Sequence, residues 1–498
     1  MQKIVLINRN KYYFAVVLIL SCLLFVKISF ADTSNHYTGK PAKYVFFLVG
    51  DGLGIPQRMA TQAYLGKKLL MDTFPAQGIT TTHANNRFIT GSAASATALA
   101  TGVKTNINYI GVDAELKKLS TIAEMAKQRG KKVGIISSVS IDHATPAAFY
   151  SHVKHRKMAH EIDVALAESG FDFFGGGGLM DPTGNKSEQP LGDALKMARE
   201  NGYTIIDNKD NFLGLNKSSG KIIAYNEWLQ DGGALPYAMD MGEKDITLAQ
   251  FTQKAVELID NPNGFFLMVE GGKIDWACHA NDATASITNN IAFDNAVQVA
   301  FDFYQTHKQE TLIVITGDHE CGGLTLGFSG TQYASHFDVL KNQKVSFQKF
   351  SDDMVKTYKA QSGASPDFDS FQPFIEKYFG LKFSPVQGSD IMAVKPHELE
   401  KIKTAFHMTM SGTKESLNKP DNYILYGGYD PLTVTLTHIM SQKAGLGWTS
   451  YKHTGVPVST SAIGVGSNLF NGAYDNTDIA KKIMSVMGID FKKQIAGI

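Results

Sequence analysis

Apolar runs of strand length recur along the chain and alternate with stretches of helical pattern. The strand-like runs lie at residues 44–49, 133–136, 171–174, 265–269 and 312–317. The helical stretches between them include residues 119–128, 159–167 and 193–200. Such alternation is typical of βαβ units. It predicts an α/β fold in which a doubly wound, mostly parallel sheet is flanked by helices.

Residues that can bind metal ions stand at, or shortly after, the ends of four of these runs. The clusters are Asp51, then Asp142 to Thr145, then Glu270 with Asp275 and His279, then Asp318 with His319. A fifth cluster begins at His453, far downstream. In open parallel sheets ligands bind outside the carboxyl ends of the strands, so we expect these side chains to converge. The pattern indicates a hydrolase site that holds several metal ions.

The segment from about residue 336 to 445 has a different character, because it is polar and helical. Helices are predicted at residues 337–359, 371–378 and 397–406. We interpret this segment as an inserted helical cap within one domain that spans residues 32–498. Insertions at this edge of a sheet often supply binding loops or lids. The chain then returns to the sheet near His453.

Residues 1–31 have the pattern of a signal peptide. Lys3, Arg9 and Lys11 precede the apolar stretch 12–30, and a small-x-small cleavage pattern ends at Ala31. Cleavage there predicts a periplasmic or secreted protein with no stable membrane span. An uncleaved membrane anchor is the alternative interpretation of the same segment.

Composition is that of an ordinary globular protein, with 43% hydrophobic and 19% charged residues. Four of the 48 basic residues and none of the 47 acidic residues lie within residues 1–31, which leaves 44 basic against 47 acidic groups. No Lys/Arg-rich run is present, so the sequence does not support nucleic-acid binding. Beyond residue 31 only Cys278 and Cys321 remain. Two cysteines exclude a disulfide framework, and two free thiols are the favoured interpretation.

Ser92 opens a run of small residues with good helix propensity that stops at Gly102. A serine at a helix N-terminus is most often a simple cap. The same position offers free backbone N–H groups and the positive end of the helix dipole to an anion. A neighbouring metal cluster would activate this hydroxyl by coordination.

Asp275 and His279 are spaced i, i+4 and so face the same way on a helical turn. Such a pair suits zinc, while Glu270 suits a harder ion such as magnesium. Taken alone, the spacing fits a surface pair equally well. Asp51 stands between two glycines after an apolar strand, where a buried carboxylate needs a cation or hydrogen-bond donors.

Taken in order, these motifs resemble the alkaline phosphatase family over nearly the whole chain after residue 31. The matching positions are Asp51, Ser92, His143 to Ala147, Arg156, Glu270 with Asp275 and His279, Asp318 with His319, and His453 to Gly455. The resemblance implies hydrolysis of phosphate monoesters to alcohol and inorganic phosphate through a phosphoserine at Ser92. It also implies small phosphorylated substrates and suggests a homodimer.

The resemblance also assigns the ligands of two zinc ions and a third, magnesium-type ion. The first zinc corresponds to Asp275, His279 and His453. The second corresponds to Asp51, Asp318 and His319, where the serine also binds, and the third site to Asp51, Thr145 and Glu270. Arg156 corresponds to the guanidinium that grips the phosphate, for which its two-pronged fork is suited.

Three positions depart from the best-known branch of that family. His143 and Gly91 each stand where an aspartate is usual, and Trp276 stands where a lysine is usual. The imidazole of His143 lowers the negative charge near the third site, which puts magnesium there in question. Without an aspartate at Gly91, we expect Arg156 to be held less firmly and phosphate to be released faster.

Three other interpretations of the same residues remain. A phosphodiesterase on the same scaffold would lack the third metal site, so Thr145 and Glu270 favour a monoesterase. A sulfatase would need a Cys-x-Pro-x-Arg motif, which the sequence lacks. A secreted metal- or phosphate-binding protein without turnover would have no use for Ser92.

Overall fold

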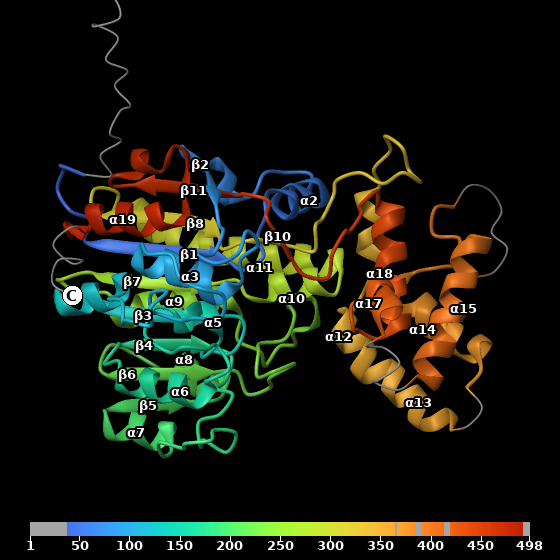
Figure 1. The fold of residues 1–498 in the computed structure, drawn as a ribbon, viewed down its shortest axis with the longest axis horizontal. Helices are drawn as coiled ribbons and strands as arrows, with labels where there is room; N and C mark the ends of the chain where they lie inside the picture. The colour runs from blue at the N-terminus through green and yellow to red at the C-terminus, as the bar shows by residue number, and fades with distance from the viewer. Residues whose placement is uncertain (1–36, 364–365, 384–389, 413–418, 492–498) are drawn as a thin grey trace, which may run out of the picture.

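The computed structural model describes residues 37–363, 366–383, 390–412 and 419–491. The predicted signal peptide, residues 1–31, lies outside these ranges. Among the described residues, ten strands form one sheet in the order β12-β2-β11-β8-β1-β7-β3-β4-β6-β5 (Figure 1). Neighbouring strands run parallel, except that β11 runs antiparallel to both β2 and β8. The predicted mostly parallel sheet is confirmed.

The strands are short and lie within the predicted apolar runs or close to them. Those of the sheet are β1 (Tyr44–Gly50), β2 (Ala76–Thr81), β3 (Lys132–Ser137), β4 (Phe173–Gly176), β5 (Tyr203–Ile206), β6 (Lys221–Tyr225), β7 (Phe265–Glu270), β8 (Thr311–Gly317), β11 (Val458–Gly464) and β12 (Gly472–Asp475). A separate antiparallel ladder pairs β9 (Glu320–Cys321) with β10 (His453–Thr454).

Helices cover both faces of the sheet, and β1 shows how. All of β1 is buried, and its side chains alternate between two cores. Val45, Phe47 and Val49 face one core, while Phe46 and Leu48 face the other. The first core is covered by α3 (Ser92–Thr101), α4 (Ile122–Gln128), α5 (Ala144–Ala147), α6 (Ala159–Glu168), α7 (Ala194–Glu200) and α19 (Asn476–Val486). The second is covered by α8 (Lys209–Leu213), α9 (Leu248–Ile259) and α11 (Ala283–Thr306).

Several further short elements belong to this framework. They are α2 (Ile55–Leu65), η1 (Leu70–Thr73), η2 (Ala238–Asp240), α10 (Lys273–His279) and η5 (Ser467–Phe470). Among the described residues, no helix has the combination of length and apolar composition needed to cross a membrane.

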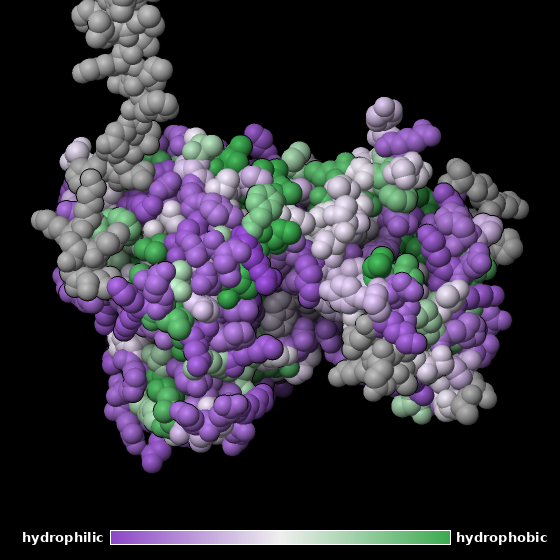
Figure 2. Space-filling model, in the orientation of Figure 1, coloured by the Kyte–Doolittle hydropathy of each residue, from purple (hydrophilic) through white to green (hydrophobic). Residues whose placement is uncertain are grey.

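The described residues between 337 and 444 form a helical region beside the sheet, drawn in orange in Figure 1. Its elements are η3 (Phe337–Asn342), α12 (Phe347–Lys349), η4 (Phe350–Val355), α13 (Lys356–Ser362), α14 (Phe368–Phe379), α15 (Pro396–Ser411), α17 (Pro420–Tyr426) and α18 (Pro431–Ala444). They surround an apolar core of their own that includes Phe350, Phe371 and Phe406. Figure 2 shows a notch in the surface between this region and the sheet. Its role as a cap stays a prediction.

One predicted helix in this region is wrong in extent. Residues 337–359 do not form one helix, because the chain leaves the helical path after η3 and starts again at Ser346. Ser346 caps α12 by accepting from the N–H of Lys349, and its own N–H donates to Asp240. These two hydrogen bonds of Ser346 stabilise a break in the helix that the helical pattern alone does not reveal.

Glu398 and Lys443 form a buried ion pair that joins α15 to α18. The Nζ–Oε2 distance is 2.9 Å, and the side chains are 8% and 4% exposed. Lys443 also donates to the carbonyl of Ala393, and Glu398 accepts from the N–H of Lys395. Removing one partner would leave a buried charge without compensation.

We therefore expect Glu398→Ala to lower the free energy of unfolding by about 3–5 kcal/mol. Thermal unfolding followed by circular dichroism measures the loss. Glu400→Ala is the matched control, because Glu400 lies on the same helix and is exposed. Equal melting temperatures for the two variants would contradict a stabilising role for the pair.

Candidate active site

The carboxyl ends of adjacent strands bring the predicted metal-binding residues together. Strands β8, β1, β7 and β3 lie side by side. Asp51 directly follows β1, Glu270 ends β7, and Asp318 directly follows β8. Because these strands are parallel, their ends meet at one edge of the sheet. The residues that the sequence places on separate strand ends are therefore neighbours in space.

Gly52 allows the end of β1 to approach α10 closely. Its φ is 69°, and a Cβ at this position would lie 2.8 Å from the Cα of Asp275. Glycine tolerates both the left-handed conformation and the close contact. The N–H of Gly52 also donates to Oδ1 of Asp318 at 3.1 Å. Gly52 thus holds Asp275 and Asp318 next to Asp51.

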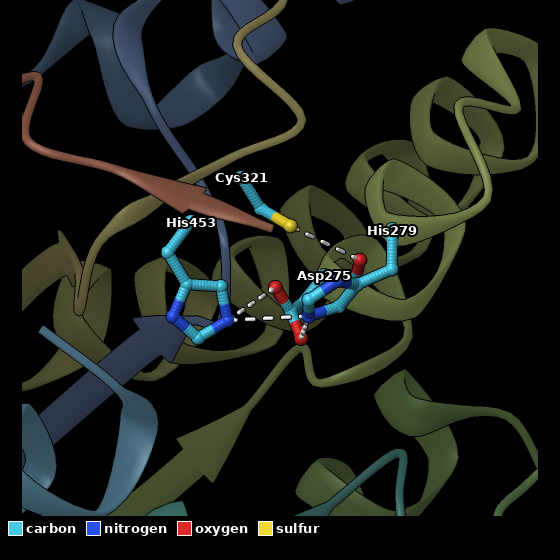
Figure 3. A group of neighbouring side chains, drawn as sticks. All are labelled: Asp275, His279, Cys321 and His453. Carbon is cyan, nitrogen blue, oxygen red and sulfur yellow. Dashed lines mark hydrogen bonds and ion pairs between the residues drawn. The ribbon is translucent and has the colours of Figure 1, made fainter. Parts of the chain in front are cut away.

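The first group of potential ligands consists of Asp275, His279, Cys321 and His453, whose ligand atoms lie within 4.8 Å of one another (Figure 3). Nε2 of His279 lies 3.3 Å from Oδ2 of Asp275, and Nε2 of His453 lies 3.6 Å from Oδ1. The two Nε2 atoms are 3.2 Å apart. Both histidine side chains therefore converge on the Asp275 carboxylate.

Main-chain carbonyls orient these two imidazoles. Nδ1 of His279 donates to the carbonyl of Tyr451 at 2.6 Å, and Nδ1 of His453 donates to that of Thr90 at 2.9 Å. A neutral imidazole that donates from Nδ1 keeps a free lone pair on Nε2. Metal-binding histidines are held in this manner by their outer nitrogen. The geometry suits a zinc ion bound by two nitrogens and a carboxylate.

The second group surrounds His319, which is fully buried. Its Nε2 lies 3.3 Å from Oδ1 of Asp51, 3.2 Å from Oδ2 of Asp318 and 3.3 Å from Oγ of Ser92. Asp51 and Asp318 are also fully buried. The Ser92 hydroxyl therefore lies beside this group, next to the imidazole and the two carboxylates.

The third group consists of Asp51, His143 and Glu270. The Thr145 hydroxyl lies 3.5 Å from Oδ2 of Asp51, and Glu270 accepts a short hydrogen bond from the Ser137 hydroxyl. Asp51 thus belongs to both the second and the third groups. The oxygen atoms of the carboxylates and hydroxyls suit a hard cation, to which His143 adds a nitrogen.

Arg156 lies next to the third group and contacts His143. Its Nη2 donates to Nε2 of His143 at 2.7 Å, and its main-chain N–H donates to the carbonyl of Asn108. Trp276 packs edge-on against the His143 ring, with centroids 5.7 Å apart. A cavity of about 470 Å³ opens beside Arg156 and His143. An anion in this cavity would meet the guanidinium directly.

The carboxylates at this edge are electrostatically unfavourable without a cation. Burial, followed by the charge of Asp318, raises the pKa of Asp51 well above its ordinary value. Burial also raises the pKa of Asp318, and it raises that of Glu270 to about 7. In the described part of the chain, the buried oxygens without a hydrogen-bond partner include Oδ1 of Asp51, Oε1 of Glu270, Oδ1 of Asp275 and Oδ2 of Asp318. Buried groups of this kind require a cation.

His143 and His319 favour the neutral form of the imidazole. Burial and then the neighbouring Arg156 lower the pKa of His143 to about 3. Burial and then the charge of His453 lower the pKa of His319 well below its ordinary value. Nδ1 of both rings is buried without a hydrogen-bond partner among the described residues. Neutral imidazoles beside unpaired carboxylates make a donor set suited to divalent cations.

Ser92 is the first residue of α3, as the sequence predicts. Gly91 is the extended residue before the helix, with φ −127°, and a Cβ there would have no atom within 4 Å. One turn later, the Ser95 hydroxyl donates to the carbonyl of Asp318 at 2.7 Å. This bond fixes the start of α3 against the end of β8. The Ser92 hydroxyl therefore lies at the positive end of a helix dipole.

Sequence reasoning did not single out Ser137 or the position of Cys321. Ser137 ends β3 at the same edge of the sheet, so the strand-end argument would have found it. Cys321 enters the first group because the β9–β10 ladder pairs it with His453. Burial raises the pKa of its thiol well above the ordinary value, which disfavours a thiolate ligand. Cys278 and Cys321 are both free, which is the interpretation that the sequence favours, and both are buried.

Comparison with known proteins gives a consistent result. A family model for alkaline phosphatase matches residues 42–489. Alkaline phosphatase 4 of Bacillus subtilis is 31% identical over 460 residues, covering 89% of this chain and 88% of that protein. The cold-active alkaline phosphatase of a psychrophilic Shewanella sp. has a TM-score of 0.73 at 29% identity, covering 89% of this chain and 99% of that one.

A further solved structure concerns the alkaline phosphatase of the Antarctic bacterium TAB5. It is a histidine-to-glutamate variant with Mg bound in the M3 site, and it has a TM-score of 0.61 at 26% identity. The match covers 91% of this chain and 99% of that one. The family match, the relatives and the strand-end site agree. The chain belongs to the alkaline phosphatase family and is a metal-dependent hydrolase of phosphate monoesters.

Proposed function

We propose that the chain hydrolyses small phosphate monoesters through a covalent phosphoserine at Ser92. The observation that carries this proposal is the position of the Ser92 hydroxyl, 3.3 Å from Nε2 of His319 and beside two buried carboxylates. Ser92 Oγ forms a bond to phosphorus while the bond to the alcohol oxygen breaks. Water then cleaves the phosphoserine, which releases inorganic phosphate and restores the hydroxyl.

In this proposal two zinc ions and one magnesium-type ion occupy the three ligand groups. Asp275, His279 and His453 hold the first zinc, and Asp51, Asp318 and His319 hold the second. Asp51, Thr145 and Glu270 hold the third ion, with His143 beside it. When bound, the ions stabilise charge on the phosphoryl oxygens and lower the pKa of the attacking hydroxyl and water.

The protein's own groups position the phosphoryl group. Two sets of hydrogen-bond donors can stabilise its negative charge, namely the first N–H groups of α3 and the guanidinium of Arg156. Positioning and electrostatic stabilisation of this kind are the main source of catalysis in phosphoryl transfer. Arg156 binds two phosphate oxygens with its fork. Its present hydrogen bond to His143 keeps it at the entrance of the 470 Å³ cavity.

His143 affects which ion the third group binds. A neutral imidazole contributes less negative charge than the aspartate that is usual there. In the TAB5 protein, replacement of a histidine by glutamate accompanies Mg in the M3 site. By the same reasoning, we propose that His143 weakens magnesium binding in this chain. A periplasmic or secreted location and a homodimer complete the proposal, resting on residues 1–31 and on family resemblance respectively.

Ser92→Ala should abolish trapping of labelled phosphoserine at low pH and lower kcat by at least about 1,000-fold, because the nucleophile is lost. Rapid acid quenching with a labelled aryl phosphate measures the first effect. Ser95→Ala is the matched control on the same helix, since its hydroxyl is bonded to the carbonyl of Asp318 and should leave the label in place. Persistent label on the Ser92→Ala protein would show that another residue is the nucleophile.

Gly91→Asp should tighten inhibition by inorganic phosphate roughly tenfold, through a charge-assisted hydrogen bond that holds Arg156. The extended backbone and the open space at Gly91 accommodate the side chain. Inhibition constants for phosphate measure the effect, with Gly91→Asn as the uncharged control. An unchanged constant in the Asp variant would contradict the idea that Arg156 is loosely held.

Metal removal should make stability more sensitive to pH. In the chelated protein, burial raises the pKa of Asp51, Asp318 and Glu270 above the values of about 4 that hold in the unfolded chain. The folded state then retains protons that the unfolded state has lost, so stability falls as pH rises through the raised pKa values. Burial lowers the pKa of His143 and His319, so above about pH 7 these two rings are neutral in both states and do not oppose this trend.

We therefore expect the melting temperature of the metal-loaded protein to exceed that of the chelated protein by an amount that widens from pH 7 to pH 9. Bound cations keep the carboxylates ionised, so the loaded protein avoids the loss. Differential scanning calorimetry at matched ionic strength measures both. A gap that stays constant with pH would show that these carboxylates are not the groups that bind the ions.

A further inference from the structure

An apolar groove borders the site beside the start of α3. Its volume is about 540 Å³, and it is lined by Arg87, Phe88, Ile89, Thr90, Gly91, Ile107, Lys452 and His453. Phe88 is 77% exposed and Ile89 is 47% exposed, so two neighbouring large apolar side chains are open to solvent at this groove.

The groove is continuous with the catalytic residues. Gly91 directly precedes Ser92, and His453 belongs to the first ligand group. The hydrogen bond from His453 Nδ1 to the carbonyl of Thr90 joins the two walls at 2.9 Å. A molecule in the groove would therefore touch both the residue before the nucleophile and a residue of the first ligand group.

Phe88 is held in place in spite of its exposure. Its ring lies against Gly455, where an added Cβ would be 2.3 Å from the ring. The N–H of Ala84 donates to the carbonyl of Arg87, and that of Ile107 donates to the side chain of Asn86. These contacts fix the loop that carries the ring. The groove thus presents a preformed aromatic surface, which lowers the entropic cost of binding.

The charges around the groove indicate what it binds. Arg87 and Lys452 line it, and neither forms an ion pair with any carboxylate in the described part of the chain. Two free cations beside an apolar surface suit a molecule that is both ring-bearing and anionic, such as a phosphate ester. They suit a second copy of the same surface less well, because like charges would then face each other.

We infer that this groove binds the leaving group of the substrate and favours alcohols that carry a flat aromatic ring. This inference rests on the proposed phosphoserine mechanism. Ser92 Oγ lies beside His319, so the attacking oxygen approaches from the second ligand group. In an in-line displacement the leaving oxygen faces away from Ser92, and the groove that Gly91 and His453 line is open to receive the alcohol. The alcohol departs with the electron pair of the broken P–O bond, takes a proton from solvent, and lies against Phe88.

Phe88→Ala tests the inference with two substrates, phenyl phosphate and glycerol phosphate. Loss of the ring–ring contact should lower kcat/KM for phenyl phosphate about 3–10-fold more than for glycerol phosphate. Both substrates form the same phosphoserine, so breakdown of that intermediate is common to both. Phe88→Ala should therefore change the ratio of kcat/KM for the two substrates. It should not change the rate at which preformed phosphoserine is hydrolysed.

Leu213→Ala is the matched control, because Leu213 is also a large apolar side chain, 53% exposed, and lies on α8. It should leave the ratio of the two kcat/KM values unchanged. The inference would be overturned if Phe88→Ala left this ratio unchanged, whether kcat/KM stayed the same or fell equally with both substrates. A lower oligomeric state of Phe88→Ala in gel filtration would also overturn it, because the face would then be a contact between copies of the chain.

Failure of the proposed mechanism has a separate signature. In that case the unmodified protein would form no acid-stable phosphoserine with either substrate, whatever the effect of Phe88. With phosphoserine present and the ratio unchanged, only the assignment of the groove would be wrong.

Discussion

The structure depends on the concentration of negative charge at one edge of the sheet. Asp51, Glu270 and Asp318 are buried where β1, β7 and β8 end, and Asp275 is held against them by Gly52. Carboxylates at such short range are costly in a desolvated site unless cations bind them. The framework that forces them together is the parallel sheet itself. The strand packing that forms the core therefore also brings these carboxylates together, and metal ions are needed to offset their charge.

The pattern of apolar runs predicted the parts of the fold that local sequence determines. Strands β1, β7 and β8 are continuous apolar segments, since both faces of a central parallel strand are buried. The reversed direction of β11 between β2 and β8 was not predicted, because it depends on pairing between segments hundreds of residues apart. The break after η3 likewise depends on Asp240, a partner about 100 residues earlier.

The ends of the predicted strands indicated the positions of Asp51, Glu270 and Asp318 in the site. The grouping of Asp275, His279 and His453 followed from family resemblance, and the structure places them within reach of one ion. The contact between Arg156 and His143 could not be inferred from spacing, because it depends on the side-chain conformations of two loops. It gives Arg156 a neutral hydrogen-bond partner, whereas a carboxylate at position 91 would supply a charged one.

The two-residue ladder between β9 and β10 has a consequence for how the chain is assembled. It joins Glu320 and Cys321, before the helical region, to His453 and Thr454, after it. The second and third ligand groups are complete once the ribosome has passed His319, whereas the first waits for more than a hundred further residues. The ladder also holds the two ends of that intervening segment together. The catalytic centre is therefore completed only after the whole helical region has been synthesised.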